Sequence, residues 1–193
     1  ARGEGADVRV VTSAAQALEW ACQIPSREVV FCAVGFETTA PATAAVVREA
    51  RRRHVNNFFV LSLHKRVPPA LELLASTPDL AVDGFLLPGH VGVILGEEPF
   101  RFLPERFGVA CALAGFEAED LASGIAELGR QVILGAWAVR SVYSRAVRPE
   151  GNLRARELLE EVFTPRRALW RGLGEVDASG LSLREDFATF DAR

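Results

Sequence analysis

The sequence contains no methionine and has no strong excess of charge of either sign. The missing methionine is expected if an initiator residue is removed before Ala1, or if the 193 residues are a piece of a longer protein. A formal net charge of −3 provides no basic field of the kind that nucleic-acid-binding proteins carry. We interpret the arginine clusters at 51–53 and 166–167 as solvated helix ends, and we expect no nucleic-acid partner.

Cysteine is scarce, and its spacing excludes the common metal motifs. Cys22, Cys32 and Cys111 are odd in number and too far apart for the C-x-x-C spacing of zinc or cluster ligands. All three lie in apolar or helical runs, which favours buried structural thiols. Unpaired thiols are typical of a reducing compartment, so we expect a cytoplasmic protein. The sequence also lacks a signal peptide and any apolar run of about 18 residues, so we expect no membrane partner.

Several enzyme motifs are absent as well. The chain has no P-loop pattern, no G-x-G-x-x-G and no G-x-S-x-G. A nucleotide cradle and a serine-hydrolase elbow are therefore not indicated.

What the sequence does contain is a regular alternation of strand and helix patterns. Apolar and β-branched runs predict strands at 8–11, 28–34, 57–63, 81–87 and 109–114. A helical pattern follows each of them, at 14–23, 40–53, 68–74, 98–107 and 117–134. Short connections between them predict an α/β fold with a doubly wound, mostly parallel five-stranded sheet. The sequence does not fix the strand order.

The alternation stops beyond Gly135. Residues 137–147 fit a strand or a helix extension, and residues 154–163 fit a helix. A glycine-rich tail then begins at Trp170 and carries Phe187 and Phe190 without an obvious partner element. We therefore expect a Rossmann-like α/β domain at 1–135. Residues 136–193 are then a less regular, helical segment and tail, which we expect to pack against something outside this chain.

The stretch from Val34 to Pro41 is the most informative part of the chain. Gly35 permits a sharp turn after an apolar strand, Thr38 or Thr39 can cap the next helix, and Pro41 fits its first turn. Glu37 is thereby fixed between a strand end and a helix start, where open α/β sheets bind their ligands.

Polar groups follow the carboxyl ends of the next strands too. Because parallel strands share one such edge, these groups are expected to converge on one crevice. The candidate crevice residues are Glu37, Thr38, Thr39, His64, Lys65, Pro88, Gly89, His90 and Glu117.

Each candidate also has a plain structural interpretation. The histidines can be hydrogen-bonded loop residues, Glu37 and Glu117 can offset helix N-terminal charge, and Lys65 can be a solvated lysine. Two histidines and two glutamates can bind a metal, but their spacing is not diagnostic, and we assign no metal ligands. Residue reasoning alone stops at a cytoplasmic α/β domain with a polar crevice.

Five ordered motifs resemble the HypD family of [NiFe]-hydrogenase maturation factors over almost the whole chain. They are Gly35–Pro41, His64-Lys65 with Pro68–Ala70, Asp83–Val91, Tyr143–Arg145 with Pro149–Asn152, and Glu161–Phe163 with Trp170–Gly174. The resemblance implies a scaffold on which the Fe(CN)2CO group of the hydrogenase is built, with HypC-like and HypE-like partners, the latter supplying cyanide. It also implies two similar α/β domains and a C-terminal [4Fe-4S] region.

The essential cysteine motifs of that family are absent here, so the resemblance covers its second α/β domain and the segment that follows. It implies that residues 136–193 are a return segment and tail that would pack on a neighbouring domain in the full-length family. Cys22, Cys32 and Cys111 do not match the functional cysteines, and no cofactor is expected in this chain. We therefore expect a fragment or truncated homologue that is not competent alone and acts as a scaffold rather than a self-sufficient enzyme. The alternative is a small cytoplasmic α/β enzyme or metal- or small-molecule-binding domain that uses the same Glu, His and Lys crevice. A degenerate relic is a third interpretation.

Overall fold

Helices and strands alternate along the first two thirds of the chain. The structure is a computed structural model that describes residues 3, 5, 7–78 and 81–193. The helices are α1 Ala14–Gln23, α2 Ala40–Arg52, α3 Val67–Ala75, α4 Gly89–Leu95, α5 Phe102–Phe107, α6 Ala118–Leu134 and α7 Leu153–Val162, with 3-10 helices η2 Glu98–Phe100 and η3 Glu185–Phe190. The strands are β1 Val29–Gly35, β2 Phe58–His64, β3 Gly84–Pro88, β4 Ala110–Ala114, β5 Val139–Ser141, β6 Phe163–Trp170 and β7 Gly174–Leu183.

The α/β class with parallel strands is confirmed, but the prediction of one five-stranded sheet is wrong. β1 and β2 form a two-stranded parallel sheet, and β3, β4 and β5 form a separate three-stranded parallel sheet. The physical reason lies at β2, whose second edge bridges to Asp191 from the end of the chain. The C-terminal segment thus takes the edge that β3 would need to extend the first sheet.

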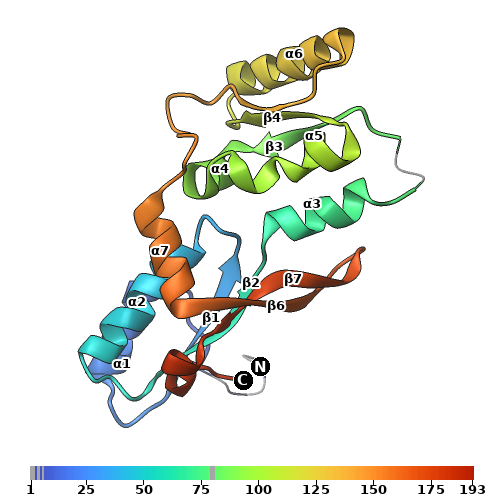
Figure 1. Ribbon diagram of the computed structural model, residues 1–193. Helices are drawn as coiled ribbons and strands as arrows, with labels where there is room; N and C mark the ends of the chain where they lie inside the picture. Colours follow the sequence, from blue (N-terminus) through green and yellow to red (C-terminus); the bar gives the residue numbers. More distant parts are fainter. Residues whose placement is uncertain (1–2, 4, 6, 79–80) are drawn as a thin grey trace.

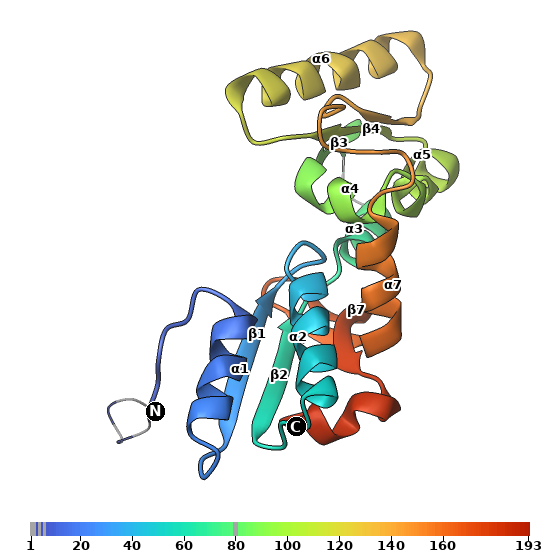
Figure 2. The same cartoon turned by 90° about the vertical axis from the view of Figure 1, so that its left-hand side faces the viewer.

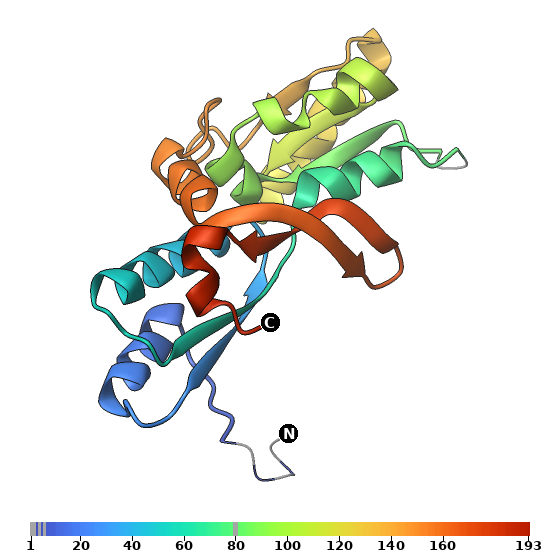
Figure 3. The ribbon, with the colours of Figure 1, turned by 60° about the horizontal axis from the view of Figure 1, so that its bottom comes forward.

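Two local predictions are also corrected. Residues 8–11, predicted as a strand, belong to no strand of the structure. The tail from Trp170, predicted to be irregular, instead continues β6 into a turn and returns as β7. The two strands form an antiparallel ribbon with Phe163 opposite Leu183. Figure 3 shows this long ribbon lying across the molecule.

The two parallel sheets have separate hydrophobic cores. The part of the chain built around β1 and β2 is here called the first lobe, and the part built around β3, β4 and β5 the second lobe (Figure 1). In the first lobe, apolar residues of α1, α2, β1 and β2 pack with residues from α7, β6, β7 and η3. In the second lobe, α3, α4 and α5 pack on β3 and β4. The division of the chain into domains at residue 135 stays a prediction. Residues on both sides of position 135 contribute to each lobe.

Helix α7 lies between the lobes and packs on α2 of the first and α4 of the second (Figures 1 and 2). Asn152 begins α7, because its side chain accepts a hydrogen bond from Ala155 N at 3.1 Å. None of the helices in the described ranges is both long and apolar enough to cross a bilayer.

Candidate functional site

The turn after β1 has the geometry that its sequence predicts. Gly35 has a φ of 148°, and a Cβ built there would lie 2.0 Å from Thr39 Oγ1, so only glycine fits. Thr39 occupies the N-cap position of α2 and Pro41 lies in its first turn, as expected. The Thr39 hydroxyl does not cap the helix; it donates to the Phe36 carbonyl at 3.3 Å. Thr38 and Thr39 are exposed.

Glu37 is directed into the protein and away from solvent. It is 3% exposed, and its Oε1 accepts a hydrogen bond from Val67 N at 2.9 Å, at the start of α3. Burial raises the pKa of Glu37 to about 7, although backbone hydrogen bonds and the charge of Arg66 act in the opposite direction. Glu37 therefore joins the β1 turn to the second lobe, and its carboxyl group is about half protonated at pH 7.

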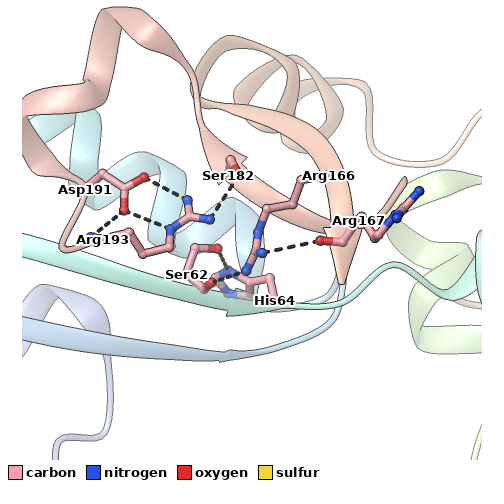
Figure 4. A network of polar contacts seen from close by, with 7 residues as sticks. All are labelled: Ser62, His64, Arg166, Arg167, Ser182, Asp191 and Arg193. Carbon is pink, nitrogen blue, oxygen red and sulfur yellow. Dashed lines mark hydrogen bonds and ion pairs between the residues drawn. The ribbon is translucent and has the colours of Figure 1, made fainter. Parts of the chain in front are cut away.

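His64 ends β2 inside the first lobe, at 1% exposure. Its Nδ1 lies 3.3 Å from Ser62 Oγ, and its ring meets Phe163 edge-on at 5.7 Å. Burial lowers the pKa of His64 to about 4, so the imidazole is neutral at physiological pH. Figure 4 shows Arg166 of β6 next to this pair, with Nη2 donating to the Ser62 carbonyl at 3.4 Å.

Lys65 is held by the β6–β7 ribbon. Its Nζ donates to the Leu169 carbonyl at 2.6 Å and lies 5.9 Å from the centre of the Trp170 ring. Trp170 in turn lies 6.0 Å from Phe36. Burial lowers the pKa of Lys65, and the charge of Arg166 adds to this effect. The lysine is therefore positioned and not simply solvated.

The remaining candidates lie in the second lobe. Pro88 ends β3, and Gly89 begins α4 so close to β4 that a Cβ would lie 2.4 Å from the Ala114 carbonyl oxygen. His90 is exposed and stacks on Phe116 with ring centres 4.7 Å apart, and Tyr143 lies on it at 5.6 Å. Glu117 is exposed at the N-cap position of α6, without a side-chain capping bond.

One carboxylate that sequence reasoning missed lies beside this aromatic group. Asp120 is buried in the first turn of α6 and receives both guanidinium nitrogens of Arg145 at 2.6 Å each. This hydrogen-bonded pair lowers the pKa of Asp120. Arg145 also lies 4.5 Å from the Tyr143 ring. Glu119 and Asp120 are both acids of the first turn of α6, and the apolar pattern of the helix does not mark Asp120 as the buried one.

The structure thus divides the predicted crevice residues into two groups. Glu37, Thr38, Thr39, His64 and Lys65 surround the ends of β1 and β2, and Pro88, Gly89, His90 and Glu117 surround the ends of β3 and β4. They do not share one sheet edge, because the strands belong to two sheets. Their participation in a binding site stays a prediction.

The described residues do not form a metal centre. No group of three or more His, Cys, Asp or Glu side chains within residues 7–78 and 81–193 is arranged to hold a metal ion. The three cysteines are free thiols on α1, β1 and β4. The prediction of buried thiols holds for Cys111, whose pKa burial raises to about 12, but it is wrong for Cys32, which is exposed on β1. The three thiols do not form a group that could hold a metal within the described part of the chain, so they do not fit as ligands of a [4Fe-4S] cluster.

Comparison with known proteins identifies relatives over the full chain. The model of the family described as HypD, hydrogenase formation hypA family, matches residues 1–193. The hydrogenase maturation factor HypD of Cupriavidus necator is 43% identical over 199 residues, which cover 100% of this chain and 52% of the relative. The hydrogenase expression/formation protein HupD of Azotobacter chroococcum is 43% identical, and HypD of Escherichia coli K12 is 40% identical, with the same coverage.

The chain therefore spans about half the length of the curated relatives it matches. Both the family model and relatives at 40–43% identity cover all of its residues. We conclude that the chain belongs to the HypD family of hydrogenase formation proteins.

Proposed function

We propose that this chain serves in [NiFe]-hydrogenase maturation as a scaffold domain, on which the Fe(CN)2CO group is assembled as cargo. The observation that carries this proposal is the match to HypD over the whole of this chain, at 40–43% identity to relatives of which it spans about half. The relatives carry about as much sequence again that has no counterpart here, and we propose that the reactive thiols and the [4Fe-4S] cluster belong to that part. The proposal includes HypC-like and HypE-like partners and a cytoplasmic location, the latter supported by three free thiols.

The exposed residues at the strand ends are the natural contact points for such a scaffold. Thr38, Thr39 and His90 face solvent, whereas Glu37 and His64 are buried and their replacement also perturbs the fold. A test of function is therefore cleaner at the exposed positions than at the buried ones.

The test places Thr38→Val, Thr39→Val and His90→Ala at the matching positions of a full-length relative, in cells that lack their own copy. We expect each variant to be produced at wild-type level and to lower hydrogenase activity at least several-fold. Arg52→Ala is a matched control, because Arg52 pairs with Glu49 on the outer surface of α2. Full activity of all three variants would contradict the role of these positions. A separate pull-down of the 193-residue chain with a HypC-type protein tests the partner.

A further inference from the structure

A cleft of about 360 Å³ lies where the two lobes meet. Its walls come from α3 and α5 of the second lobe, from α7, and from β6 and β7. Most of the lining is apolar, and it includes Pro68, Pro69, Phe102, Leu159 and Phe163. This volume lies within the range of small-molecule sites, which are mainly apolar with a few placed polar groups.

Glu37 is the polar group placed in this cleft. It lines the cleft, it is 97% buried, and its Oε2 has no hydrogen-bond partner among the described residues. Its other oxygen is used by Val67 N. The start of α3 offers no second donor, because Pro68 and Pro69 follow Val67 and lack an N–H. The sequence of α3 therefore leaves Oε2 available to a ligand.

The charges that line the cleft are balanced. Arg66 precedes α3 and Glu72 lies within it, and Arg156 and Glu160 come from α7. The lining residues of α4, η2, α5, β6 and β7 carry no ionisable group. Apart from Glu37 itself, two cations and two carboxylates line the cleft, so while Glu37 is protonated the lining favours neither sign and an uncharged occupant fits better than an ion.

The protonation state of Glu37 decides which hydrogen bond is offered. Burial raises its pKa to about 7, so below pH 7 most molecules carry a protonated carboxyl group, which can donate through Oε2 while Oε1 accepts from Val67 N. A capping role at Val67 uses only the acceptor. The donor is left for a molecule with a carbonyl-type oxygen.

We propose that the interlobe cleft is a binding site for a small, uncharged, mainly apolar molecule whose single hydrogen-bond acceptor is held by the carboxyl group of Glu37. This site is separate from the exposed strand ends invoked for hydrogenase maturation, and it does not depend on that role. Binding joins the β1 turn to α3 and α7, and so connects the two lobes.

The test uses four probes with one ring and different polar groups, titrated into the 193-residue chain and followed by NMR with ¹³C-carboxyl-labelled glutamate. The probes are acetophenone, toluene, benzoate and benzylammonium. We expect acetophenone to bind at least tenfold more tightly than the other three at pH 6 and to shift the Glu37 carboxyl signal. Above pH 7 its affinity should fall about tenfold per pH unit, because only the protonated carboxyl group donates.

Two variants separate a binding role from a structural one. Glu37→Gln keeps a donor at the same place and should bind acetophenone with an affinity that no longer changes with pH. Glu72→Gln, on the same wall of the cleft, should behave as the wild type. Equal binding of toluene, tighter binding of either ion, or an affinity for acetophenone that is independent of pH in the wild type would overturn the proposal. Absence of binding by all four probes would overturn it too.

Discussion

Replacing Glu37 with glutamine is expected to change how the stability of the chain depends on pH. Burial raises the pKa of Glu37 from 4.5 to about 7, so the folded chain keeps a proton that the unfolded chain releases. This contribution to stability is fully present below pH 4.5 and is lost as the pH rises through 7. His64 acts in the opposite direction. Burial lowers its pKa from 6.5 to about 4, so its contribution is present above pH 6.5 and lost as the pH falls through 4.

The two effects are similar in size and cancel over part of the range. Each change in pKa corresponds to about 3 kcal/mol, at about 1.4 kcal/mol per pH unit. Between pH 4.5 and 6.5 the opposite slopes offset each other in the wild type. Glu37→Gln removes one slope and leaves that of His64. The free energy of unfolding of the variant, minus that of the wild type, should therefore rise by about 3 kcal/mol from pH 4 to pH 8.

Urea unfolding followed by tryptophan fluorescence, in steps of half a pH unit, measures this difference. Subtraction removes the contributions of all other titrating groups, which both proteins share. Any constant cost of the glutamine side chain shifts the difference curve without changing its slope. Glu72→Gln is the control, and its curve should run parallel to the wild type. If the Glu37→Gln curve also runs parallel to that of the wild type, the conclusion that folding raises the pKa of Glu37 is refuted.

Three further predictions follow from single contacts. Gly35→Ala should lower the free energy of unfolding, measured in the same urea assay, by about 2 kcal/mol or more, because the added Cβ meets Thr39 at a position with positive φ. Gly129→Ala has open space around it in α6 and should raise the free energy of unfolding by about 0.5–1 kcal/mol. Cys32 is exposed and should react with a thiol reagent in the native chain, whereas buried Cys111, with a pKa of about 12, should react only on unfolding; equal rates would contradict this. Asp120→Asn should lower the unfolding temperature at neutral pH but much less at low pH, because pairing with Arg145 lowers the pKa of Asp120 and its contribution is lost as the pH falls.

The individual elements were predictable because their signals are local. The helix predicted at 14–23, the strand predicted at 28–34 and the turn at Gly35 each depend on neighbouring residues, and the structure has them at Ala14–Gln23, Val29–Gly35 and Gly35. The division into two sheets depends instead on Asp191 reaching Val60, a contact between residues far apart in the sequence. The spacing of apolar residues along the chain carries no information about such a contact. The prediction of a single five-stranded sheet was therefore wrong.

The sequence predicted which residues lie at the strand ends, but not which of their side chains face the interior and which face solvent. Glu37 and Thr38 are adjacent, yet one is buried against α3 and the other faces solvent. Their sequence positions gave no sign of this difference. The β6–β7 ribbon was missed because Gly172 and Gly174 suggested an irregular tail. Both have positive φ values, Gly172 in the turn that joins the two strands and Gly174 at the start of β7.

The contribution of β7 and η3 to the first core also has a consequence for the order of folding during synthesis. Phe58 and Val60 pack with Leu181, Leu183 and Phe187, which are made much later. At about 5–20 residues per second, a ribosome needs roughly 6–24 s to add residues 65–186. The second core, from Val67 to Val147, is complete well within that interval. The lobe that starts first should therefore finish last, and the nascent chain should expose its first sheet to chaperones until the ribbon arrives.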